Sequence, residues 1–272
     1  MKNLAHRTFS AVIAISIFAT LLYFFSESGV YAMVLFAVIR GSYEMSRMFL
    51  RKTFPQFVSW YLMLVCIVTF ILCTTDRFRS LAVLAILFAF IAIIFSAIFL
   101  HKKFQQLESV LNYITLSSLT LIYTAVIPLS AAWMLYQPHG LKWFLCLLAV
   151  VFTGDIGAYV SGTLFGKTKI APLLSPNKSL QGALGGLLFS TVAACCFSIV
   201  LVHVPIHILA ICGFFGGLFG QVGDFFESLI KRVAGVKDSG SIMPGHGGVL
   251  DRLDGVLLAA PLFYIAAYYL GL

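Results

Sequence analysis

The sequence predicts an all-α, polytopic integral membrane protein with about nine transmembrane helices and two polar loops on the cytoplasmic side. Hydrophobic residues make up 61% of the chain, against roughly 45–50% in soluble domains. Charged residues make up only 10%, where about 25% is usual, and the mean hydropathy is +1.01. So few charges cannot cover the surface of a soluble fold, so the main solvent must be lipid.

The apolar runs divide into spans when they are measured against the ~20 residues that cross a bilayer as a helix. The expected spans are 8–25, 29–49, 57–75, 80–100, 110–136, 141–161, 183–203, 207–228 and 251–271. The first run follows Lys2 and Arg7 but is longer than the apolar part of a signal peptide, so we expect an uncleaved helix. Arg40, Glu44 and Arg47 interrupt the second span on one helical face, where they can pair.

The distribution of Lys and Arg predicts the orientation. With the amino terminus in the cytoplasm, and with Arg40 and Arg252 left out because they lie in or at span ends, thirteen of these residues lie on the cytoplasmic side and three, Arg77, Arg79 and Lys142, lie on the other. We therefore expect a multi-pass protein of the cell (inner) membrane, with its N-terminus cytoplasmic and, given nine spans, its C-terminus outside.

The net charge of +8 is compatible with anionic lipid, anionic substrates or nucleic acid. The basic residues come singly or in pairs between apolar runs, which argues against nucleic acid as a partner. The six cysteines lie in apolar stretches without a CxxC pair, so neither a zinc site nor a disulfide framework is expected.

The acidic residues concentrate in the last part of the chain. Carboxylates are costly in lipid, and six of the ten fall between Asp155 and Asp254. The same region holds the two polar loops, 162–182 and 229–250. We therefore expect residues 1–150 to form a scaffold of transmembrane helices and residues 151–272 to form a catalytic region.

Three of these carboxylates have the positions of metal ligands. Asp251 and Asp254 are three residues apart at the start of the last span, so they share a helical face, and Asp224 lies near the cytoplasmic end of the eighth span. Oxygen ligands of this kind suit one or two Mg²⁺ ions. The structural alternative is that they cap helices or pair with Arg232 and Arg252.

The loop between the last two spans is rich in glycine and charge. Gly240, Gly245, Gly247 and Gly248 permit close approach of a ligand, and exposed N–H groups can cradle phosphate. Lys231, Arg232 and Lys237 add charges suited to phosphate oxygens. His246 among these residues is either a structural hydrogen-bonding residue or part of the site.

The run Ser228–Asp254, SLIKRVAGVKDSGSIMPGHGGVLDRLD, resembles the signature of the phosphatidate cytidylyltransferase (CDP-diacylglycerol synthase) family. The matching elements are S-x-x-K-R, K-D, P-x-H-G-G and D-R-x-D, in that order. The resemblance extends back through GD at 223–224, DIGAY at 155–159 and GK at 166–167 to SPNKS at 175–179, and so covers roughly residues 150–255.

The resemblance implies that CTP and phosphatidic acid react to CDP-diacylglycerol and pyrophosphate in phospholipid biosynthesis, with Mg²⁺, in a membrane protein for which a homodimer is left open. It assigns catalytic roles to Lys237, Asp238, His246 and Arg252. Substrate contacts are expected at Lys178, Ser179, Ser228, Lys231, Arg232, Gly247 and Gly248, and metal contacts at Asp224, Asp251 and Asp254.

The segment 175–182 departs from the family pattern S-P-K-K-T-W-E-G, because Leu180 and Gln181 replace its tryptophan and its acid. The loss of that carboxylate puts in doubt any metal-binding or charge role of this segment. It also keeps open the alternative of a CTP-dependent polyprenol or phytol kinase, which shares similar motifs.

Two further classes are disfavoured. An ion path through Asp155 and Asp224 would suit a transporter, but the polar residues gather at one end of the chain without repeated halves. A CDP-alcohol phosphotransferase would need further aspartates after the DRLDG run, and none follows.

Overall fold

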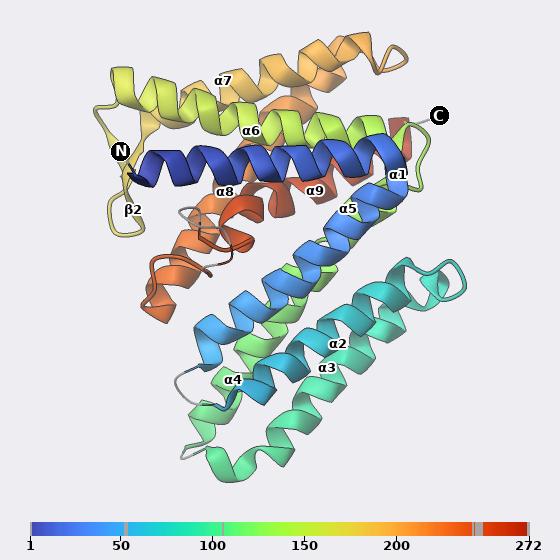
Figure 1. Cartoon of the computed structure of the whole chain (residues 1–272), viewed down its shortest axis with the longest axis vertical. Helices are drawn as coiled ribbons and strands as arrows, with labels where there is room; N and C mark the ends of the chain where they lie inside the picture. The colour runs from blue at the N-terminus through green and yellow to red at the C-terminus, as the bar shows by residue number, and fades with distance from the viewer. Residues whose placement is uncertain (1, 52–53, 105, 241, 243–246, 271–272) are drawn as a thin grey trace. The chain divides into compact units, whose positions relative to one another are not determined.

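The computed structural model describes residues 2–51, 54–104, 106–240, 242 and 247–270, and their side chains from residue 16 onward. It is predominantly helical, as the composition predicted (Figure 1). The helices are α1 (Lys2–Leu50), α2 (Gln56–Thr74), α3 (Ala82–Phe99), α4 (Leu107–Leu121), α5 (Leu129–Met134), α6 (Gly140–Phe165), α7 (Leu180–Cys196), α8 (Ile206–Ala234) and α9 (Leu250–Leu270). A π-helical turn, Ile122–Val126, follows α4.

The described residues contain eight helices long and apolar enough to cross a membrane, close to the nine expected. The difference lies at the beginning of the chain, where two spans were predicted on either side of residues 26–28. In the structure two helical segments meet directly at Ser26, whose backbone is not helical (φ 49°, ψ −122°), so α1 consists of two helices joined by a sharp kink without an intervening loop (Figure 1). The protein is a multi-pass membrane protein.

The chain forms two compact units, and their boundary differs from the expected division at residue 150. The first unit comprises residues 1–132 and 236–251, and the second comprises residues 133–235 and 252–272. The glycine-rich loop therefore belongs to the same unit as the N-terminal helices, which we had assigned to a scaffold.

In the first unit, polar side chains join neighbouring apolar helices. The Tyr31 hydroxyl of α1 lies 2.8 Å from Thr74 Oγ1 of α2, and the Tyr61 hydroxyl of α2 donates to the carbonyl of Ala92 in α3 (2.8 Å). Apolar side chains gain little free energy by exchanging lipid contacts for contacts with each other. Association of helices in a membrane therefore depends on van der Waals packing and on interhelical hydrogen bonds such as these.

In the second unit, small residues let α6, α7 and α8 approach closely. Ser190 of α7 donates to the carbonyl of Val150 in α6 (2.8 Å). A Cβ at Gly154 of α6 would lie 2.3 Å from Ser190 Oγ, and a Cβ at Gly217 of α8 would lie 2.6 Å from the same atom. Glycines on either side of a small serine are typical of tightly packed membrane helices.

A short antiparallel hairpin connects α6 to α7 in the second unit. Its strands are β1 (Lys169–Ala171) and β2 (Ser175–Ser179), with Lys169 opposite Ser179. The hairpin lies in the predicted polar loop 162–182, where strands were not expected because three- and five-residue strands leave little periodic pattern. It carries Lys178 into the candidate site.

Candidate active site

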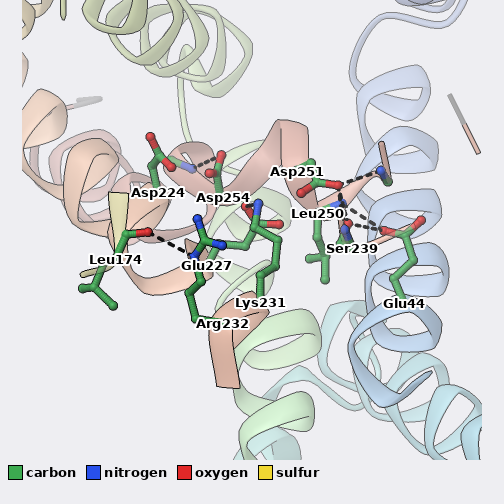
Figure 2. Close-up of polar contacts among 12 residues, drawn as sticks. Glu44, Leu174, Asp224, Glu227, Lys231, Arg232, Ser239, Leu250, Asp251 and Asp254 are labelled. Carbon is green, nitrogen blue, oxygen red and sulfur yellow. Dashed lines mark hydrogen bonds and ion pairs between the residues drawn. The ribbon is translucent and has the colours of Figure 1, made fainter. Parts of the chain in front are cut away.

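The candidate site in the second unit begins where α8 crosses α9. A Cβ at Gly223 would lie 2.2 Å from the carbonyl oxygen of Asp254 and 3.1 Å from Gly255 Cα, so only glycine permits this approach. Asp224 follows Gly223 on α8. The close crossing therefore brings the carboxylates of Asp224 and Asp254 into the same neighbourhood, as Figure 2 shows.

Lys178 of β2 forms an ion pair with Asp224 of α8. Its ammonium also lies over the ring of Phe225, 4.2 Å from the ring centre, in the geometry of a cation–π contact. Both charged side chains are partly exposed, at 28% and 37% of their side-chain surface. A ligand can therefore reach the pair, and two residues expected in the site from sequence are joined by the fold.

Asp155 of α6 adds a third carboxylate to this neighbourhood. It experiences electrostatic repulsion from Asp224 and attraction to Lys178 and Arg252. Asp254 is likewise repelled by Asp224 and, more weakly, by Asp155. Acidic side chains that repel one another beside partly or fully exposed basic side chains form a site that favours an additional cation.

Asp224 and Asp254 suit Mg²⁺ as two of its ligands rather than as a complete set of protein ligands. No group of three or more His, Cys, Asp or Glu side chains could hold a metal ion within the part of the chain that the structure describes. Mg²⁺, however, is usually bound by one or two carboxylates together with water and substrate phosphates. Asp224 and Asp254 supply oxygen donors of that kind.

Asp251, the remaining predicted metal ligand, belongs to the first unit. Its Oδ2 accepts hydrogen bonds from the backbone N–H of Ser239 (2.9 Å), from the Ser239 hydroxyl (2.8 Å) and from the backbone N–H of Gly248 (2.8 Å). Asp251 Oδ2 therefore caps the start of a helix, which is the structural alternative considered for these aspartates. Metal binding by Asp251 stays a prediction.

Two predicted phosphate ligands on α8 have protein partners. Lys231 donates to the buried carboxylate of Glu227, one turn earlier (2.9 Å), and Arg232 donates through Nε to the carbonyl of Leu174 between the hairpin strands (3.4 Å; Figure 2). Arg232 is exposed, so its guanidinium can still meet an anion. Ser228 is half-buried one turn before Arg232.

The segment that departs from the family pattern has a clear structural role. The side-chain oxygen of Gln181 accepts the backbone N–H groups of Lys167 (3.1 Å) and Thr168 (3.2 Å), while Ser179 Oγ caps α7 by accepting from Gly182 N (3.2 Å). Holding the hairpin in this way requires an acceptor oxygen at 181 rather than a negative charge. The replacement of an acid by Gln181 therefore keeps the segment folded.

We expect Gln181→Leu to loosen the start of the hairpin, because two backbone donors lose their acceptor, and Gln181→Glu to preserve it. Trypsin should cut after Lys167 about tenfold faster in the Leu variant, which corresponds to roughly 1.4 kcal/mol of easier local opening. Cleavage after Lys102 and Lys103, in the other unit, provides an internal control. Equal rates after Lys167 in all variants would contradict this role.

In the first unit, the loop residues Lys237 and Asp238 are exposed, as catalytic side chains should be. Gly247 has a positive φ (+82°), and a Cβ there would lie 2.5 Å from Asp251 Oδ2. Gly248 is buried. His246 lies outside the described residues, and Arg252 is exposed in the first turn of α9.

Glu44 is a polar residue that the sequence analysis noticed but did not assign to the site. The sequence placed Arg40, Glu44 and Arg47 on one helical face where they can pair, and in the structure Arg40 Nη2 lies 3.6 Å from Glu44 Oε1. The structure adds that Glu44 also contacts Ser239 and Val249, about 200 residues later in the chain. Both residues belong to the glycine-rich loop between α8 and α9, residues 235–249, which we call the signature loop. A carboxylate within an apolar span was the available signal for a role beyond pairing.

The fold and its charged residues thus define a multi-pass membrane protein with a partly exposed cluster of carboxylates and basic side chains on α6, β2, α8 and α9. The chain belongs to the cytidylyltransferase family, whose sequence model matches residues 5–270. That match covers both compact units.

Individual relatives share part of the chain. A phosphatidate cytidylyltransferase of Staphylococcus epidermidis is 42% identical over 130 residues, which are 47% of this chain and 50% of the relative. The Bacillus subtilis protein of that name is 42% identical over 127 residues (46% and 47%), and that of Mycobacterium leprae is 37% identical over 172 residues (59% and 55%). The chain thus spans about half the length of the curated relatives it matches.

Proposed function

We propose that this protein transfers a cytidylyl group from CTP to phosphatidic acid, forming CDP-diacylglycerol and pyrophosphate for phospholipid synthesis. The observation that carries this proposal is the Lys178–Asp224 pair beside Asp254 in a chain whose family match is nearly complete. The printed names of the relatives support phosphatidic acid as the acceptor.

The reaction joins two anions, so the residues of the site must mainly neutralise and align them. A phosphate oxygen of the lipid attacks the α-phosphorus of CTP, the bond to the bridging oxygen breaks, and pyrophosphate leaves with the electron pair. The second pKa of a phosphomonoester is about 6, so the attacking oxygen is already largely anionic at neutral pH. Lys178, Arg232 and Arg252 can offset the charge of the approaching phosphates.

We propose that Asp224 and Asp254 hold Mg²⁺; metal binding by Asp251, expected from the sequence, stays a separate prediction. Bound there, Mg²⁺ would neutralise charge on the phosphates and help to align them for in-line displacement. Lys178 forms an ion pair with Asp224 in the structure. With Mg²⁺ bound to Asp224, Lys178 can turn from that carboxylate to a substrate phosphate, because its side chain is long, flexible and partly exposed.

A membrane-embedded site suits a lipid acceptor. Asp224 lies ten residues before the end of α8 at Ala234, about 15 Å along the helix axis. A lipid phosphate can approach from within the membrane while its acyl chains stay in lipid, where each exposed CH₂ would otherwise cost about 0.8 kcal/mol. We further propose an inner-membrane location with the site cytoplasmic and the N-terminus inside. A C-terminus outside requires that both segments of α1, before and after Ser26, cross the membrane, which gives the nine crossings expected from the sequence. A homodimer stays a prediction.

The proposal is tested with full-length protein in phospholipid nanodiscs, Mg²⁺ and CTP labelled either at the α- or at the γ-phosphate. We expect the α-label to appear in lipid when phosphatidic acid is present and EDTA to abolish the transfer. A γ-label transferred to a polyprenol would instead identify a lipid kinase, which the comparisons do not favour. Equal use of glycerol 3-phosphate would argue against a lipid-facing site.

A further inference from the structure

The buried carboxylate of Glu44 holds the signature loop from within the first unit. Its Oε2 accepts hydrogen bonds from the backbone N–H groups of Val249 (2.9 Å) and Leu250 (3.1 Å). The same oxygen lies 3.3 Å from the Ser239 hydroxyl, whose one hydrogen it shares with Asp251 (Figure 2). Val249 directly precedes α9 and Leu250 begins it, where backbone donors lack partners within the helix and negative charge is favourable. Glu44 is only 3% exposed.

The glycines of the loop fit against this carboxylate. A Cβ at Gly240 would lie 2.7 Å from Glu44 Oε1, and a Cβ at Gly248 would lie 2.5 Å from Glu44 Oε2. The sequence had suggested that these glycines admit a phosphate to the backbone. The structure supplies a different reason for their small size, which is that Glu44 occupies the space beside them.

Glu44 and Asp251 organise the same serine. Ser239 Oγ lies 2.8 Å from Asp251 Oδ2 and 3.3 Å from Glu44 Oε2, and Asp251 also accepts the N–H of Ser239. Ser239 directly follows Lys237 and Asp238, the exposed charged residues of the loop. Its conformation therefore determines where these two side chains begin.

We propose that Glu44 is a positioning residue, which acts through Ser239, Val249 and Leu250 to hold Lys237 and Asp238 in their reactive arrangement. The burial of a carboxylate is costly unless donors surround it, and here the donors come from the loop itself. The proposal rests on the proposed cytidylyl transfer for its catalytic consequence, while the hold on the loop is independent of that reaction.

Three variants of the full-length protein test the proposal. Glu44→Ala removes the acceptor, Glu44→Gln keeps an acceptor oxygen of the same reach without the charge, and Ser46→Ala is the matched control. Ser46 is buried on the same helix, and its hydroxyl donates to the carbonyl of Tyr43. Melting in detergent identifies any variant that fails to fold, and Glu44→Gln, which is nearly isosteric, keeps the test decisive.

The first measurement is hydrogen–deuterium exchange of the peptides covering residues 236–250. We expect Glu44→Ala to speed their exchange at least about tenfold, Glu44→Gln to change it less than about threefold, and Ser46→Ala to leave it unchanged. Peptides from α2 serve as the reference. Unchanged exchange in a folded Glu44→Ala variant would overturn the proposal whatever reaction the protein performs.

The second measurement is the kinetics of transfer from CTP to phosphatidic acid. Loss of positioning should lower kcat about thirtyfold in Glu44→Ala while KM for CTP stays within about threefold, and Glu44→Gln should recover most of the rate. A looser loop with normal kcat, or equal losses in the Ala and Gln variants, would overturn the proposal. If the wild type transfers no cytidylyl group, the proposed function fails, and the exchange measurement still decides whether Glu44 holds the loop.

Discussion

Replacing Asp224 with Asn should lower cytidylyl transfer by at least about a hundredfold, or roughly 2.7 kcal/mol of barrier. The substitution keeps the shape of the side chain but removes the charge that pairs with Lys178 and that we propose to hold Mg²⁺ beside Asp254. The measurement is the steady-state rate with phosphatidic acid in nanodiscs over a range of Mg²⁺ concentrations. A weaker metal ligand should also raise the concentration needed for half-maximal rate.

Two controls separate this role from the mere loss of an ion pair. Asp76 pairs with Arg79 in an exposed segment of the first unit, and Asp76→Asn should change the rate less than about twofold, because exposed pairs contribute little. The exchange of partners, Lys178→Asp with Asp224→Lys, should keep the ion pair and the fold but leave the protein inactive. Recovery of activity in the exchanged variant, or retention of more than a tenth of the rate in Asp224→Asn, would contradict a catalytic role for this pair.

Gly223→Ala should be almost as damaging, although it alters no charged residue. The new Cβ would lie 2.2 Å from the carbonyl oxygen of Asp254, and neither backbone can yield without separating α8 from α9. We expect a loss of about 1–3 kcal/mol in stability from overpacking and a fall in kcat of at least about thirtyfold, because Asp224 and Asp254 move apart. Thermal melting in detergent and the transfer assay measure the two effects.

Gly220→Ala provides the matched control one turn earlier on α8. A Cβ at Gly220 would meet its nearest neighbour, Val151 Cγ2, at 3.7 Å, which is ordinary van der Waals contact. Alanine also favours the helix by about 1 kcal/mol over glycine. This variant should therefore melt no lower than the wild type and keep its rate. Similar losses at both positions would show that α8 tolerates no side chain there and that the crossing at Gly223 has no special role.

The membrane fold was predictable from composition because a backbone in lipid must satisfy its own hydrogen bonds, and apolar runs of about 20 residues do so as helices. The break near residue 26 was also predicted, but its form was not. Ser26 bends α1 without a polar loop, and a local backbone angle of this kind leaves no composition signal. The hairpin that carries Lys178 was missed because its strands are short.

The sequence predicted which residues belong to the candidate site better than it predicted which contacts those residues make. The family resemblance indicated Lys178, the positions at helix ends indicated Asp224 and Asp254, and the fold brings the three residues together in one unit. For Asp251 and Gly248, the structure shows contacts within the loop where metal and phosphate had been expected. Gln181 had been taken as a loss of charge, whereas its oxygen holds the hairpin in place.

What the sequence determined by itself is the solvent of this protein and the chemistry of its side chains, because apolar runs and the types of charged residue are properties of the chain. Tertiary structure decided which charges become partners. Glu44 reaches Val249 because the loop glycines Gly240 and Gly248 leave room for its carboxylate, and Asp224 meets Lys178 because the hairpin carries β2 to α8. Carboxylates in a low-dielectric environment are stable only beside donors or cations, so these tertiary contacts also determine which acids hold the backbone in place and which stay accessible to substrate.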